Sequence, residues 1–106
     1  MDIEFTENYL KELYEEGKSS SKKGGFQKDI IKRYKNAIDK LRVATKIEDL
    51  FPIKSLNYEK LHGNKKGLES IRVNDKYRIE FISRIEGEEP HSITICAIVN
   101  LSNHYA

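Results

Sequence analysis

Apolar and polar residues alternate on both sides of the short stretch "NDK" at residues 74–76. A period of two is typical of half-buried strands, and Asn and Asp favour turns, so we expect a hairpin with a three-residue loop. This register pairs Ile71 with Ile79 on one face and sets Arg72 opposite Arg78 on the other face. The apolar positions of the pattern are Ile71, Val73, Tyr77, Ile79 and Phe81.

The first half of the chain shows the spacing of amphipathic helices. We expect a short strand over residues 1–5, then a helix that Thr6 caps and that ends at Glu16, before Gly17. The strongest helical pattern spans residues 26–41, where apolar side chains recur at intervals of three and four. These side chains are Phe26, Ile30, Tyr34, Ala37, Ile38 and Leu41.

The second half of the chain is expected to be mostly β-structure. "TKIE" at residues 45–48 fits a capping box for a short helix through Leu50. An extended segment near residues 56–61, the hairpin and a last strand over residues 92–99 follow. We therefore predict one α+β domain over residues 1–106, with an antiparallel sheet of four to five strands and two main helices packed on one face. The arginine face of the hairpin is then the face that the helices leave uncovered.

Composition places this domain among small intracellular proteins. The chain has 106 residues, enough for a single core, and one cysteine, Cys96, which excludes an internal disulfide. Cys96 lies in an apolar run and is expected to be a buried core residue. The N-terminus has no apolar signal segment, and no stretch is long enough to span a membrane. We expect a cytoplasmic protein without a membrane partner.

Charge is unevenly distributed although the net charge is only +2. Residues 18–46 hold ten Lys or Arg against two Asp, a balance of +8, whereas residues 1–16 hold one Lys against six acids, a balance of −5. The basic segment predicts an anionic partner. A solvated helix face remains the alternative on charge alone.

The polar face of the hairpin and the end of the chain carry candidate catalytic groups. Glu59, Arg72, Arg78, His104 and Tyr105 can converge if the hairpin is central in the sheet. A carboxylate can deprotonate a ribose 2′-hydroxyl, arginines can stabilise a phosphate carrying extra charge, and a histidine can protonate the leaving oxygen. A tyrosine can stack on a base or assist proton transfer. The set predicts phosphodiester cleavage without a metal.

Three further residues before the hairpin are candidates for substrate binding. His62 lies beside the expected site, and Lys65 and Lys66 can contact a nucleic-acid backbone. "GNKKG" does not fit a phosphate-binding P-loop. One cysteine and three scattered histidines do not give the spacing of a metal site, so we expect neither a metal nor another cofactor.

Taken together, "LHGNKKGLESIRVNDKYRIEF" (residues 61–81) resembles the HigB branch of the RelE/ParE toxin superfamily. The similarity extends back through the basic helix and "EDL" and includes the terminal "HY". Two differences are that His62 replaces a common lysine, and that Ser102, Asn103 and His104 stand where many HigB proteins have Asp-Tyr-His.

The resemblance implies a RelE-like fold and a toxin that a HigA-type helix-turn-helix antitoxin holds inactive. Related toxins cleave messenger RNA, typically in the ribosomal A site. By this resemblance Glu59 matches the catalytic glutamate of YoeB-like relatives, at a position that is often histidine in HigB proteins, and Arg78 matches the arginine that stabilises the scissile phosphate. Arg72 matches a phosphate contact, and His104 with Tyr105 match the terminal His-Tyr pair of YoeB-like toxins.

Two other functions remain open from the residues. A ParE-like toxin would inhibit a protein target such as gyrase, but that version of the fold generally lacks the acid-base residues. A plain nucleic-acid-binding module would use the basic segment and would be indifferent to the 2′-hydroxyl. For the RNA-cleaving toxin, replacing Arg78 on a solvated face is expected to abolish toxicity and leave the fold intact, with a slight gain in stability from relieved charge repulsion.

Overall fold

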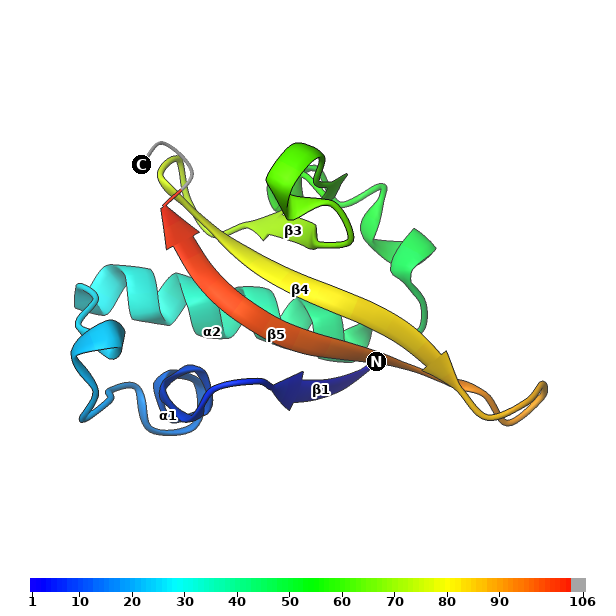
Figure 1. Cartoon of the computed structure of the whole chain (residues 1–106), viewed down its shortest axis with the longest axis horizontal. Helices are drawn as coiled ribbons and strands as arrows, with labels where there is room; N and C mark the ends of the chain where they lie inside the picture. Colours follow the sequence, from blue (N-terminus) through cyan, green and yellow to red (C-terminus); the bar gives the residue numbers. More distant parts are fainter. Residues whose placement is uncertain (104–106) are drawn as a thin grey trace.

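The computed structural model describes residues 1–103, which form a five-stranded sheet with two main helices (Figure 1). The order across the sheet is β1-β5-β4-β3-β2, in which β1 runs parallel to β5 and all other neighbours are antiparallel. This confirms the predicted α+β class. The strands are β1 (Asp2–Phe5), β2 (Glu59–Lys60), β3 (Glu69–Arg72), β4 (Tyr77–Glu86) and β5 (Ile93–Asn103).

The helices are α1 (Asn8–Glu16) and α2 (Lys28–Val43). In Figure 1 α2 lies behind β4 and β5, while α1 follows β1 and is seen end-on. The Tyr34 hydroxyl of α2 donates a hydrogen bond of 2.9 Å to the backbone carbonyl of Leu10 in α1. Apolar side chains of both helices and of β3, β4 and β5 form one core, which includes Ile71, Ile79, Phe81 and Ile98.

The ends of α1 follow the predicted stop signal but not the predicted start. Gly17 ends the helix in the left-handed region, with a φ of 73°, where a residue without a Cβ avoids strain. The N-cap is Glu7 rather than Thr6. The Thr6 hydroxyl instead donates to the carbonyl of Ile98, 2.9 Å away, because β1 brings it alongside β5.

Four short 3-10 helices connect the main elements: η1 (Lys22–Gly24), η2 (Ile47–Leu50), η3 (Lys54–Leu56) and η4 (Gly63–Lys65). The predicted capping box is displaced by one residue. The Asp49 carboxylate, not that of Glu48, accepts hydrogen bonds from the backbone N–H groups of Thr45 and Lys46.

Phe26 was predicted in the second helix but precedes it, and its ring packs edge-on against Tyr77 at a centroid distance of 5.6 Å.

The hairpin has the predicted register. Ile71 pairs with Ile79, Arg72 pairs with Arg78, and the backbone N–H of Val73 donates to the carbonyl of Tyr77. β5 is longer than predicted and reaches Asn103. Because β5 borders β4 through most of this length, β4 is a central strand and the arginines lie inside the sheet rather than at its edge.

The two faces of the sheet differ in the residues they carry. Ile71 and Ile79 are fully buried under the helices, whereas Arg72 is exposed on the opposite face.

Cys96 is buried as predicted, and this burial raises the pKa of its thiol to about 11, so the thiol stays protonated at neutral pH. Within residues 1–103, no helix has the length and apolar character needed to cross a membrane.

Candidate functional site

The strand register aligns polar residues in two rows across the open face of the sheet. In the first row Glu59 of β2 pairs with Ser70 of β3, which pairs with Glu80 of β4, which pairs with Asn100 of β5. In the second row, two residues further along, Arg72 pairs with Arg78 and Arg78 with Ser102. Three residues predicted to act together, Glu59, Arg72 and Arg78, therefore come from three adjacent strands.

A hollow of about 130 Å³ lies between these rows. Its size suits a single phosphate group or a few water molecules, and its walls combine two carboxylates, Glu59 and Asp75, with two arginines. The floor is formed by strands, so the positions of the side chains follow from the sheet register. The lining residues are Asn57, Glu59, Ser70, Arg72, Asn74, Asp75, Tyr77 and Arg78.

Glu59 reaches the hollow from an exposed position on the short edge strand β2. The turn before this strand depends on Asn57, which adopts a left-handed conformation with a φ of 42°. Asn is one of the few side chains that tolerate this conformation. The Asn57 amide also donates to the Glu59 carboxylate at 3.4 Å, a long contact that leaves Glu59 accessible to a substrate proton.

Arg72 is paired with Asp75 of the hairpin turn. Both side chains are open to solvent, with exposed fractions of 45% for Arg72 and 89% for Asp75. Asn74 closes the same turn because its side-chain oxygen accepts the backbone N–H groups of Lys76 and Tyr77. The turn thus holds a carboxylate beside Arg72, on a surface where such ion pairs are weak.

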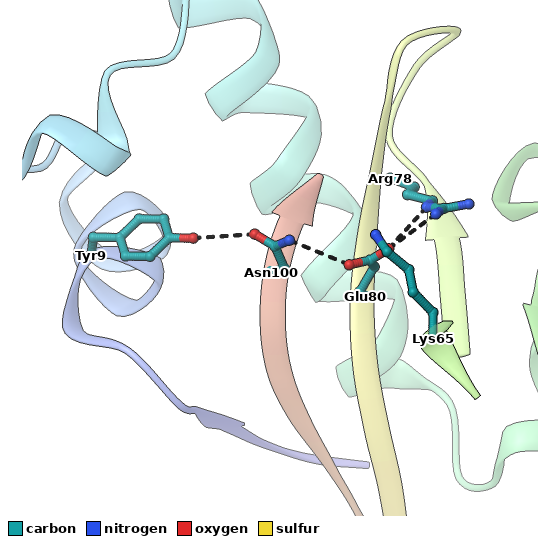
Figure 2. A network of polar contacts seen from close by, with 5 residues as sticks. All are labelled: Tyr9, Lys65, Arg78, Glu80 and Asn100. Carbon is teal, nitrogen blue, oxygen red and sulfur yellow. Dashed lines mark hydrogen bonds and ion pairs between the residues drawn. The ribbon is translucent and has the colours of Figure 1, made fainter. Parts of the chain in front are cut away.

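Arg78 is paired with Glu80, and the two side chains are far less exposed (Figure 2). Both Nε and Nη2 of Arg78 lie 3.1 Å from Oε2 of Glu80. Nζ of Lys65, from η4, approaches the same oxygen at 2.6 Å. The other oxygen of Glu80 accepts a hydrogen bond of 3.3 Å from the Asn100 amide. A buried carboxylate therefore lies beneath the cationic side of the hollow.

This contact changes the expected role of Arg78 in stability. Its side chain is only 17% exposed and neutralises a Glu80 side chain that is 2% exposed. Removing Arg78 would leave that carboxylate with one cation fewer in a place that excludes water. The expectation that Arg78 is a solvated residue without a structural role is therefore wrong. The repulsion between the two arginines is offset by carboxylates of the same chain.

The structure gathers only some of the predicted substrate-binding residues at the hollow. Lys65 reaches the site through Glu80. His62 and Lys66 instead line a second hollow, together with Tyr58 and the exposed ring of Phe51. His104 and Tyr105 lie outside the described residues, which end at Asn103.

Sequence reasoning missed the residues that support Arg78. Glu80 and Asn100 were not singled out, although the hairpin register places Glu80 on the same face as Arg78. A charged residue at that position of a central strand could have indicated a buried ion pair. Ser70, which lines the hollow, was missed as well. Among residues 1–103 no three His, Cys, Asp or Glu side chains lie together as possible metal ligands.

The described part of the site can bind an anion and accept a proton. Arg72 and Arg78 supply planar donors suited to phosphate oxygens, and Glu59 supplies an accessible carboxylate nearby. Glu59, Arg72 and Arg78 all line this hollow, and the Glu59 carboxylate accepts a hydrogen bond from Asn57. A phosphate with its adjacent hydroxyl is the ligand that this combination fits.

Comparison with known proteins identifies a family. Residues 3–89 match the family model of HigB-like toxins, described as the RelE-like toxin of type II toxin–antitoxin system HigB. A solved structure with a similar fold is the YoeB/ParE toxin from Agrobacterium tumefaciens, at 15% sequence identity and a TM-score of 0.48, with 99% of this chain and 100% of that chain covered. No curated protein matches the sequence significantly. Because the family model covers most of its length, the chain belongs to the HigB-like toxins of type II toxin–antitoxin systems.

Proposed function

We propose that the protein is an endoribonuclease that cleaves messenger RNA on the ribosome and so inhibits translation. Membership of the HigB-like family gives it a toxin role and implies an antitoxin partner. The observation that carries the more specific proposal is the shared hollow of Glu59, Arg72 and Arg78 on the open face. A toxin that acts only by binding another protein does not need this combination of base and anion site.

In the proposed reaction Glu59 accepts the proton of a ribose 2′-hydroxyl, whose oxygen then attacks the adjacent phosphorus. Arg78 and Arg72 stabilise the extra negative charge on the phosphate oxygens. The bond to the 5′-oxygen of the next nucleotide breaks, and His104 protonates that oxygen. Tyr105 stacks on a base or assists the proton transfer. The products are a 2′,3′-cyclic phosphate and a 5′-hydroxyl, and no metal takes part.

The proposed partners follow from charge and family. Lysines of α2 contact ribosomal RNA or an acidic antitoxin segment, since Lys28 and Lys32 are exposed on the basic helix. We further propose that the antitoxin is a HigA-type helix-turn-helix protein. It prevents activity by covering the arginine face or by blocking entry to the ribosome.

The test uses the full-length protein, freed of its antitoxin, on translating ribosomes. Messenger RNA fragments should carry 2′,3′-cyclic phosphate ends, and a single 2′-deoxyribose at the cleaved position should abolish cleavage there. A transcript cut equally well with the 2′-deoxy substitution would exclude this mechanism. Inhibition of gyrase with intact messenger RNA would instead establish the ParE-like alternative.

A further inference from the structure

The buried carboxylate of Glu80 contacts Arg78 on the open face of the sheet. The Glu80 side chain is 2% exposed, although it belongs to the face of the sheet that the helices leave uncovered. Removing an ionised carboxylate from water is unfavourable unless charges and hydrogen bonds compensate for it. Each oxygen of Glu80 has such partners, from three separate elements of the fold.

The partners of Glu80 include two cations: Arg78, which lines the hollow, and Lys65. Arg78 contacts Oε2 with two nitrogens, at 3.1 Å each, and Lys65 contacts the same oxygen at 2.6 Å. Lys65 comes from η4, so the contact joins this loop to the centre of the sheet (Figure 2). A guanidinium held by its Nε and one Nη cannot rotate freely about its last side-chain bonds.

The carboxylate is itself fixed on the other side. The Asn100 amide donates to Oε1 of Glu80 at 3.3 Å, and the Tyr9 hydroxyl of α1 lies 3.5 Å from the Asn100 side-chain oxygen. Figure 2 shows these contacts as one row from α1 across β5 to β4. We propose that Glu80 is a positioning residue that holds Arg78 and Lys65 ready for the scissile phosphate, an inference that rests on the proposed function. Donors fixed before reaction stabilise a transition state without reorganising during it.

A second buried carboxylate gives a matched control. Glu69 is 9% exposed and lies on the helix-covered face, since it pairs with the core residue Phe81. Its oxygens accept from the Tyr58 hydroxyl at 2.6 Å, the Ser83 hydroxyl at 2.6 Å and the Ser83 N–H at 2.9 Å. These partners carry no charge and belong to no part of the arginine hollow. A purely structural carboxylate is expected to behave like Glu69.

The experiment compares Glu80→Gln with Glu69→Gln in the full-length toxin. Cleavage of ribosome-bound messenger RNA is measured under single-turnover conditions, as a rate per folded molecule, beside the affinity for the ribosome. We expect Glu80→Gln to slow the cleavage step at least tenfold with less than a threefold change in affinity. Glu69→Gln should lower the melting temperature but leave the rate unchanged. An equal loss of rate in both variants would overturn the proposal.

A double-mutant cycle tests whether Glu80 acts through Arg78. In an Arg78→Ala background, the effect of Glu80→Gln on the rate should shrink to less than threefold. A tenfold loss that persists in this background would mean that Glu80 does not act by positioning Arg78.

A readout independent of activity separates this inference from the proposed function. The Arg78 Nε–H signal in NMR spectra should be sharp in the parent and in Glu69→Gln, and broadened by solvent exchange in Glu80→Gln. A signal unaffected by Glu80→Gln would contradict positioning even if the parent cleaves. If the parent does not cleave RNA, the proposed function fails, and the NMR result still decides whether Glu80 orders the arginine.

Discussion

Arg72 and Arg78 pair across the same hairpin, yet their surroundings differ. Arg72 is 45% exposed and contacts Asp75, which is 89% exposed, whereas Arg78 is 17% exposed and contacts Glu80, which is 2% exposed. Ion pairs on the surface contribute little and exchange readily with solvent, while breaking a buried pair leaves a charge without compensation. The comparison indicates that Arg78 is held in place and Arg72 is free to reorient when a phosphate enters.

The largest expected difference is in catalysis. Arg78→Ala should slow messenger RNA cleavage by about a hundredfold, roughly 3 kcal/mol of transition-state stabilisation, because it removes a fixed donor. Arg72→Ala should have a smaller effect, about tenfold, because water can partly replace a mobile, exposed donor. Single-turnover rates on ribosomes, normalised to folded protein, check both values. Equal losses would show that burial of the partner carboxylate does not matter for the reaction.

The next difference concerns the free energy of unfolding. Arg78→Met should lower it by about 2 kcal/mol, less than the loss of an isolated buried pair, because Glu80 keeps Lys65 and Asn100 as partners. Arg72→Met should change it by less than about 0.5 kcal/mol. Urea denaturation at pH 7 measures both. A stability gain in Arg78→Met would mean that charge repulsion across the hairpin outweighs the contact with Glu80.

A smaller effect is expected at the hairpin turn. Asp75 neutralises Arg72 in the free protein, so a phosphate must compete with it for the arginine. Asp75→Asn should therefore tighten ribosome binding by roughly threefold, and the gain should decrease as salt concentration rises. The same substitution in an Arg72→Ala background is the control. A gain of the same size there would show that Asp75 acts as a general negative charge.

The smallest effect is expected at an arginine remote from the hollow. Arg84 contacts Glu4 at 2.6 Å and Glu86 at 3.0 Å, and its hydrogen bond lowers the pKa of Glu4. Because the folded-state pKa is the lower one, the contact favours folding above the ordinary value of 4.5 and loses this effect as pH falls. Arg84→Ala should raise the pKa of Glu4 toward that value in an NMR titration and leave cleavage unchanged. An unmoved pKa would mean that this ion pair is not formed in solution.

The sequence pattern predicted an element correctly where the residues that signal it lie within one short stretch of the chain. The alternation around residues 74–76 correctly predicted the loop length and the Arg72–Arg78 pairing, because a one-residue slip would expose both flanking apolar faces. The spacing of apolar residues likewise predicted α2, and Gly17 the end of α1. Signals for helix starts failed at Thr6 and Thr45, since neighbouring backbone and carboxylate groups offered better partners.

The sequence by itself determined that Glu80 shares a face with Arg78, because alternate residues of a strand point the same way. Only the tertiary structure decided that this carboxylate is buried and shared. Lys65 comes from a loop 15 residues away, and Asn100 from a strand 20 residues further along the chain. The meeting of Glu59 with the arginines likewise depends on how β2 pairs with β3. Such contacts follow from the packing of distant segments, whose relative positions no local periodicity encodes.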